Sequence, residues 1–295
     1  MTVNFPQLRA FLAVVDAGGF SAAAAELGMS QSAVSHAVAS LERELAAPLL
    51  VRSGPVRTTA LGEQVLPHAR SALAAVRSVR ELAADDARTM TGTVCLASTP
   101  TVCQGLVPAL LGHWRASRPG ITVRVFEGDS EEVERWLENG TADAAVLIDP
   151  PAGPGVQLAA DAYCALLPRD HPLADEAVVD LADLEDDELL ISPNGCEARV
   201  RALHGLAGLR FTPAHRVRDL ATLIRMVQAG LGVTVLSEVS RSLVPPDLVL
   251  LPVVPRASRR LVLAGPRSRP WHPAVRPLAE SAAARLAGEG TLARS

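Results

Sequence analysis

The sequence predicts an all-α domain that contains a helix–turn–helix, then one long helix, and then an α/β domain of two lobes. Three patterns indicate this order. Apolar residues recur at helical spacing as far as residue 45, a seam of small and β-branched residues follows, and strand-like runs alternate with helical runs from residue 93 onward. At 295 residues and 48% hydrophobic composition, the chain is long enough to bury two or three cores. The expected boundaries are residues 1–59, 60–91 and 92–295.

A first helix is expected after Asn4, whose side chain can cap it. Gly18 and Gly19 end the helical pattern. The apolar face of this helix would supply one wall of a small helical core, and it consists of Leu8, Phe11, Leu12 and Val15.

Two further helices follow at the spacing of a helix–turn–helix. Ser21 can cap a helix at 22–27, and Gly28 supplies the turn. Ser30 then caps a helix that we expect at 31–45.

The helix at 31–45 has two unlike faces. One face is an apolar stripe at i, i+4, i+7 and i+11, made of Val34, Val38, Leu41 and Leu45. The opposite face carries short polar side chains, Gln31, Ser32, Ser35 and His36. The major groove of DNA admits a helix with small hydrogen-bonding side chains at its outward N-terminal end. The alternative is an ordinary helical bundle with polar outer faces.

A longer motif distinguishes the two interpretations. From residue 21 the chain reads S-x-A-A-x-x-L-x-x-S-Q-S-A-V-S-x-x-V-x-x-L-E, which resembles the N-terminal signature of LysR-type transcriptional regulators. The match is nearly unbroken from Phe11 to Glu42, and it continues through Pro48-Leu49 and Arg52 into the family's wing and linker helix. The resemblance implies a winged helix–turn–helix that binds double-stranded operator DNA. The residues expected to contact DNA are Ser21, Ser30, Gln31, Ser32, Ser35, His36, Arg52 and Arg57.

Charge argues against a nonspecific nucleic-acid coating protein. Residues 1–60 carry four arginines and four acidic residues, and the whole chain has a net charge of −4. Nonspecific affinity should therefore be modest and centred on Arg52 and Arg57. A neutral module gains most from binding repeated half-sites as a homodimer or homotetramer.

The remaining composition excludes several classes of protein. The chain has no lysine, which removes Schiff-base chemistry and a P-loop lysine. We expect a cytoplasmic protein that is not a membrane protein, since we find no secretory signal and no run of 18 apolar residues. The histidines are scattered and no hydrolase or zinc-protease motif occurs, so we do not expect an enzyme.

One long helix is expected from Thr59 to about Ala87, followed by a hinge to Gly92. Its small and β-branched residues alternate in steps of four and three, as in a coiled coil. Packing of this helix on its own domain is the alternative. The residues expected to support dimerisation are Val65, Val76 and Val79.

From residue 93 the pattern becomes βαβαβ, which predicts a parallel sheet. Strand-like runs lie at 93–97, 121–128 and 143–148, and helices are expected at 102–117 and 130–139. A second set follows, with strands at 189–192, 214–217 and 232–237 and helices from 197 and at 220–229. The connections between the two sets are a crossing strand at 163–167 and return strands at 248–253 and 260–265. A closing helix is expected at 273–287.

Two such lobes joined by two crossings would leave a cleft between them. The family resemblance implies a type 2 periplasmic-binding-protein-like effector domain. We expect lobe one at about 92–162 and 266–290, and lobe two at about 163–265. A solute-binding protein would share these lobes, but it would need a secretory signal and would have no helix–turn–helix.

A small-molecule effector is expected beyond the carboxyl ends of the strands, where helices begin. Hydroxyl and N–H groups there suit an anion, and Arg199 could add charge or could pair with Glu197. The alternative is that Ser98 and Thr99 simply cap a helix. The expected effector residues are Ser98, Thr99, Pro100, Thr101, Asn194, Gly195, Cys196, Glu197 and Thr222.

The four cysteines form no C-x-x-C pair, so we expect no metal and no cofactor. Cys196 is expected at a helix start near Arg199, where a thiolate would be stabilised. The LysR family includes peroxide sensors with a reactive cysteine in this lobe, so a redox-sensing regulator is the alternative. Against it, no second cysteine follows to resolve an oxidised Cys196.

Overall fold

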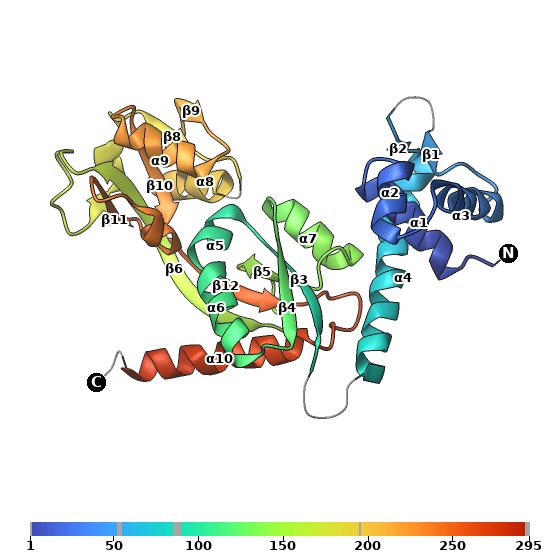
Figure 1. Ribbon diagram of the computed structural model, residues 1–295. Coiled ribbons are helices and arrows are strands. Elements are labelled where there is room, and N and C mark those ends of the chain that lie inside the picture. The colour runs from blue at the N-terminus through green and yellow to red at the C-terminus, as the bar shows by residue number, and fades with distance from the viewer. Residues whose placement is uncertain (1, 52–54, 85–89, 195, 293–295) are drawn as a thin grey trace. The chain divides into compact units, whose positions relative to one another are not determined.

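The computed structural model describes the chain apart from residues 1, 52–54, 85–89, 195 and 293–295. The chain divides into two compact units (Figure 1). The first unit is residues 1–88 with the short stretch 139–141, and the second is the remainder. In the part of the chain that the structure describes, no helix is both long and apolar enough to cross a membrane.

The first unit is a helix–turn–helix domain with a short hairpin and a long helix. The three predicted helices are confirmed, and the antiparallel pair β1–β2 that follows them forms the base of the wing implied by the family resemblance. The predicted hinge lies largely outside the described residues. The elements of this unit are α1 (Phe5–Asp16), α2 (Phe20–Leu27), α3 (Gln31–Glu44), β1 (Leu50–Val51), β2 (Arg57–Thr58) and α4 (Ala60–Ala84).

Local capping chemistry explains most of these boundaries. Asn4 and Gln7 form a reciprocal capping box at the start of α1. Gly28 ends α2 in the left-handed region at φ 64°, and the Ser30 hydroxyl caps α3 by accepting from a backbone N–H at 3.2 Å. The expected cap at Ser21 is wrong, because α2 begins at Phe20, two residues earlier than predicted, and Ser21 lies inside its first turn.

The core of the first unit is built from the predicted apolar stripes. Fully buried residues from α1 and α3 meet there, and the first half of α4 packs against them. Val65, which we expected in a dimer seam, packs against this core. By contrast, Val79 on the second half of α4 is 65% exposed.

The second unit contains two lobes. Its elements are β3 (Gly92–Ser98), α5 (Pro100–Gly105), α6 (Val107–Ser117), β4 (Ile121–Glu127), α7 (Ser130–Asn139), β5 (Ala144–Ile148), β6 (Val156–Pro168), β7 (Val179–Asp180), η1 (Leu181–Leu184), β8 (Leu189–Ile191), α8 (Glu197–Leu206), β9 (His215–Arg216), α9 (Leu220–Gln228), β10 (Val233–Ser237), η2 (Glu238–Leu243), β11 (Leu248–Val254), β12 (Ser258–Ala264) and α10 (Val275–Leu292).

The sheet confirms the predicted βαβαβ pattern. Strand β3 pairs in parallel with β4 and β5, and β10 pairs in parallel with β8. The helix expected at 102–117 is two helices, α5 and α6, which are separated at Leu106. The strand order is β4-β3-β5-β12-β6-β10-β8-β9, with β11 beside β6 and β7.

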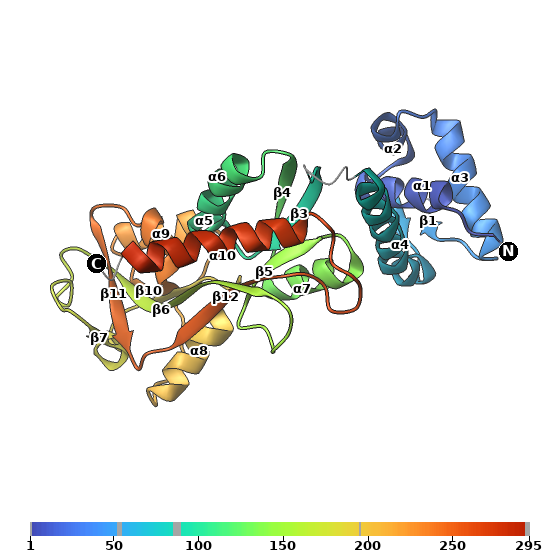
Figure 2. The same ribbon diagram turned by 90° about the horizontal axis from the view of Figure 1, so that it is seen from below.

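Strand β6 is longer than expected and joins the two lobes (Figure 1). Its first half pairs with β12 and its second half with β10 and β11. Strand β12 also pairs with β5, so the chain returns to lobe one at Ser258 and not near residue 266 as predicted. Helix α10 then runs beside lobe one, where it contacts α6 and β6 (Figure 2).

The two lobes also approach each other at α5 and η2. An added Cβ atom at Gly105 would lie only 2.1 Å from the carbonyl oxygen of Val239. Only glycine can allow this close approach of the two backbones. The contact lies just after the predicted effector loop at Thr99, which is the residue before α5.

Candidate functional site

The outward face of α3 brings four of the predicted polar residues together. Gln31, Ser32 and His36 are exposed, and Ser35 is half-buried. The opposite residues Val34, Val38 and Leu41 are fully buried in the helical core, so the polar face is turned to solvent.

Three serines form hydrogen bonds at the N-terminal end of this face. The Ser21 hydroxyl donates to Gln31 Oε1 at 3.2 Å, and the hydroxyls of Ser30 and Ser32 are 3.0 Å apart. The predicted role of Ser21 as a cap is therefore replaced by a contact with the side chain of Gln31. Sequence reasoning missed this contact because it joins two helices.

Glu42 ties the end of α3 to the hairpin. Its Oε1 accepts from the backbone N–H groups of Leu49 and Leu50, at 2.9 and 3.2 Å. Arg57 is exposed on β2, and Arg52 lies outside the described residues. Arg57 thus belongs to a hairpin that is fixed at its base to α3.

In lobe one, the predicted effector loop is mostly closed. Ser98 is fully buried and donates to the Val146 carbonyl at 2.9 Å, and Thr101 is also buried. Thr99 is 3% exposed, and its hydroxyl oxygen has no hydrogen-bond partner among the described residues. Pro100 begins α5 and is half-buried. Thr99 therefore has a buried hydroxyl that no described residue binds.

In lobe two, the predicted effector residues are engaged with neighbours. The Asn194 amide donates to the Arg218 carbonyl at 3.2 Å, and the Thr222 hydroxyl bonds to the capping Asp219 at 2.7 Å. Gly195 lies outside the described residues. These bonds hold the loops of lobe two and leave the expected groups less free for a ligand.

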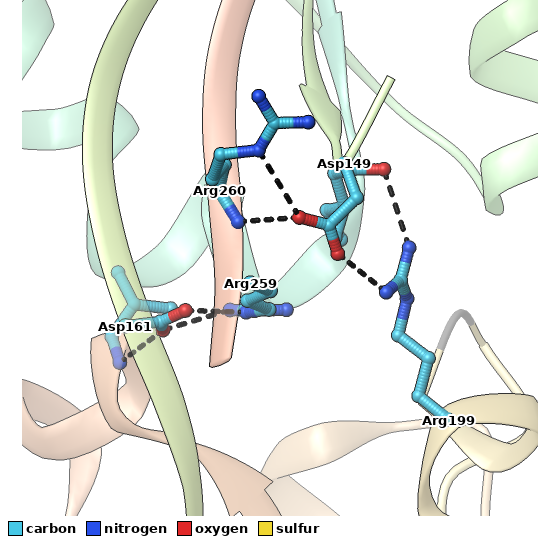
Figure 3. A network of polar contacts seen from close by, with 7 residues as sticks. Asp149, Asp161, Arg199, Arg259 and Arg260 are labelled. Carbon is cyan, nitrogen blue, oxygen red and sulfur yellow. Dashed lines mark hydrogen bonds and ion pairs between the residues drawn. The ribbon is translucent and has the colours of Figure 1, made fainter. Parts of the chain in front are cut away.

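Of the two roles considered for Arg199, pairing with Glu197 is not the one that the structure shows. The Glu197 carboxylate accepts from Arg201 at 2.7 Å and from Arg216 at 3.2 Å, both within lobe two. Arg199 points elsewhere and pairs with Asp149 of lobe one at 2.5 Å (Figure 3). The two arginines neutralise the charge of the Glu197 carboxylate, so it does not repel an anionic ligand as an unpaired carboxylate would.

A buried ion pair lies where β6 and β12 join the lobes. Arg259 Nε donates to Asp161 Oδ1 at 2.6 Å and its Nη2 donates to Oδ2 at 3.1 Å (Figure 3). The side chains are 0% and 8% exposed. Burial alone would lower the pKa of Arg259, but the hydrogen bond and charge of Asp161 raise it above its ordinary value. Asp161 therefore favours the charged form of the Arg259 guanidinium.

Sequence reasoning missed both residues of this pair. Asp161 lies two residues before the predicted crossing strand, and Arg259 one residue before the predicted return strand. A charged residue within two positions of a strand-like run is the signal that could have drawn attention to them, because a strand can extend past its apolar run and a charged residue is rarely buried without a partner.

Cys196 lies in this neighbourhood, but it is not activated as expected. It occupies the capping position of α8 and is 2% exposed. Burial raises the pKa of its thiol, and the opposing charges of Arg259 and Arg199 do not overcome this effect. The expected stabilised thiolate is therefore wrong for this arrangement.

Two polar atoms near Cys196 have no partner among the described residues. They are the Tyr163 hydroxyl and Arg259 Nη1. The Arg259 guanidinium lies 5.7 Å from the centre of the Tyr163 ring, and burial raises the pKa of Tyr163 to about 12. Buried donors and acceptors left unpaired are costly, so a polar molecule that meets them would be favoured.

Two family models together match most of the chain. Residues 5–63 match the bacterial regulatory helix-turn-helix protein, lysR family, and residues 87–287 match the LysR substrate binding domain.

Curated relatives match over most of their length. The uncharacterized HTH-type transcriptional regulator YvbU of Bacillus subtilis is 30% identical over 90% of this chain and 92% of its own. A probable hydrogen peroxide-inducible genes activator of Mycobacterium avium is 35% identical over 78% of this chain and 76% of its own.

Solved structures share the fold. A full-length OxyR variant from Pseudomonas aeruginosa superposes with a TM-score of 0.76 at 25% identity, over 96% of this chain and 95% of that chain. Full-length CbnR in complex with its target DNA gives a TM-score of 0.69 at 24% identity, over 96% and 99%.

Proposed function

Because the chain belongs to the LysR family of DNA-binding transcriptional regulators, we propose that α3 reads operator DNA in the major groove. Gln31, Ser32, Ser35 and His36 would face the base edges. The observation that carries this proposal is the solvent-facing polar surface of α3, whose opposite side is fully buried. We place the regulator in the cytoplasm, because operator DNA lies there.

Gln31 is the residue best suited to read a base. A glutamine can form two hydrogen bonds to adenine, through N6 and N7. Its amide oxygen already accepts from Ser21, and this contact orients the side chain at the surface. Preorganisation of this kind lowers the entropy lost when DNA is bound. Arg52 and Arg57 would contact phosphates and position the domain.

We further propose that the second half of α4 pairs two copies of the chain. Val79 is 65% exposed and Val76 is half-buried, whereas Leu61, Val65 and Leu73 pack on the unit's own core. Val76 and Val79 thus form an apolar strip on α4 that the core of the first unit does not bury. Such a strip suits a contact with the same helix of a second copy. A homodimer or homotetramer would present two or more copies of α3 to repeated half-sites.

The effector would bind between the lobes, near Thr99 and the β6 crossing. The unpartnered atoms of Thr99, Tyr163 and Arg259 support this position.

Arg259 and Arg199 are already paired with aspartates. Arg259 is balanced by Asp161, but Asp149 is shared by Arg199 and by Arg260, whose Nε lies 3.9 Å from Oδ1 (Figure 3). Two arginines against one carboxylate leave an unbalanced positive charge, which supports a small anionic effector.

Replacing Gln31 with alanine should weaken specific DNA binding. We expect a loss of about 1–3 kcal/mol on operator DNA, because one base-reading side chain is removed, and little change on random DNA. Gel-shift titration against the intergenic DNA upstream of the chain's own gene measures both. Gln157→Ala, an exposed glutamine of the second unit, is the matched control. An equal loss on operator and random DNA would contradict base reading.

A negative charge at Val79 should separate the two copies. Val79→Glu places a carboxylate in the proposed apolar contact, so sedimentation should show monomers and operator affinity should fall by at least tenfold, roughly the loss of one half-site contact. Ser78→Glu adds the same charge about 100° around the helix and is the control. An unchanged oligomer in Val79→Glu would count decisively against the seam.

A second function, thiol-based redox sensing, is favoured by one arrangement. Cys196 lies beside Arg259, whose spare Nη1 could bind a peroxide oxygen. Attack of the Cys196 sulfur on the O–O bond of hydrogen peroxide would give a sulfenic acid and one water. The mycobacterial relatives named as peroxide-inducible activators also support this candidate.

Cysteine reactivity separates the two functions. Because burial raises the pKa of Cys196, its thiolate fraction at pH 7 lies below that of an exposed cysteine and rises only above the ordinary pKa. We therefore expect slow alkylation by iodoacetamide at pH 7, and a rate that increases with pH beyond 9. Mass spectrometry follows Cys196 and the buried Cys164, whose raised pKa is about 11, as a control. Rapid, selective sulfenic acid formation at Cys196 with micromolar peroxide at pH 7 would favour the redox sensor instead.

A further inference from the structure

Asp149 is fixed at the end of β5 by the backbone of lobe one. It adopts a left-handed conformation, with φ 46°. Its N–H donates to the Arg260 carbonyl at 2.9 Å, and its Oδ1 accepts from the Arg260 N–H at 2.6 Å. A non-glycine residue in this conformation carries strain that the surrounding bonds must offset. The carboxylate is thus held at a set position on lobe one.

Arg199 reaches this carboxylate from the other lobe. It lies in the first turn of α8, and its Nη1 donates to Asp149 Oδ2 at 2.5 Å. Its Nη2 donates to the Ile148 carbonyl at 3.3 Å. Figure 3 shows the Arg199 side chain extending from α8 to the end of β5. One guanidinium therefore spans the two lobes with two hydrogen bonds.

We propose that Asp149 and Arg199 form a releasable latch that holds the lobes together and positions the first turn of α8. The proposal concerns regulation of the effector site and rests on the proposed position of that site. Cys196 occupies the capping position of α8, three residues before Arg199. A ligand that binds between the lobes and moves them apart must break the Asp149–Arg199 contact, and one that leaves their spacing unchanged preserves it. The latch therefore adds to the free-energy difference between the two lobe arrangements and so affects the response to the effector.

Exposure separates this latch from the Asp161–Arg259 pair. The side chains of Arg199 and Asp149 are 37% and 26% exposed, whereas those of Arg259 and Asp161 are 0% and 8% exposed. Water can solvate the latch residues when they part, so separating them costs little free energy. Loss of a buried partner is far more costly. The buried pair therefore acts as the fixed hinge point, and the latch as the contact that opens.

Helix α8 supplies a matched control for the latch. Arg201 lies two residues after Arg199 and also pairs with a carboxylate, that of Glu197, but this pair stays within lobe two. Replacing either arginine with glutamine removes one charge and one ion pair from the same helix. Only the change at Arg199 removes a contact between the lobes.

Amide hydrogen exchange on the full chain, without ligand or DNA, tests the latch. We expect Arg199→Gln and Asp149→Asn each to speed exchange at least threefold in two peptides, one over residues 146–150 and one over 196–206. Asp149→Asn also weakens the contact with Arg260, so the double variant should be no faster than Asp149→Asn alone, in which the contact with Arg199 is already lost. Arg201→Gln should leave residues 146–150 unchanged.

Unchanged exchange over residues 146–150 in Arg199→Gln would overturn the latch, and so would a double variant whose acceleration is the product of the two single effects. Failure of the effector proposal has a different signature, because it would appear as ligand binding that does not depend on Thr99 while the exchange pattern stays as described.

Discussion

The buried ion pair between Asp161 and Arg259 is the constraint on which the second unit depends. The two residues face each other on β6 and β12, at the point where β6 leaves lobe one. Their charges are shielded from water, so each is stable only because the other is present. Asp161 also accepts from the Val239 N–H at 3.0 Å, and this bond attaches η2 of lobe two to the same carboxylate. One aspartate thereby joins β12, β6 and η2, and sets how the lobes meet.

The proposed effector site follows from this hinge point. Two of the three Arg259 nitrogens, Nε and Nη2, donate to Asp161, and the third, Nη1, lies beside Tyr163 and Cys196 and has no partner among the described residues. The same ion pair therefore anchors the lobes and leaves a polar group for a ligand. The second lobe contact, between Asp149 and Arg199, is partly exposed to water and can open. A rigid hinge and a weaker latch together give a domain that can change its lobe spacing without unfolding.

Local chemistry was predictable from the sequence, and long-range pairing was not. Gly28 and Ser30 act within a few residues of the chain, so the turn and the start of α3 were predicted correctly. The prediction for Ser21 was wrong because Gly19 and Ser21 both suit a helix start and only packing selects between them. The Asp161–Arg259 pair spans 98 residues. Both residues lie just outside the strand-like runs. The spacing of apolar residues predicts strands and helices, but it does not predict which charged residues pair.

The most direct test of this account is a double-mutant cycle on Asp161 and Arg259. Urea unfolding of the full chain would be followed by tryptophan fluorescence, since Trp114, Trp136 and Trp271 all lie in lobe one. Asp161→Asn and Arg259→Met should each lower the free energy of unfolding by about 3–5 kcal/mol, because each leaves a buried charge without its partner. The double variant should lose about as much as one single variant. Losses below about 1 kcal/mol, as for an exposed pair, or losses that simply add, would contradict the central role of this ion pair.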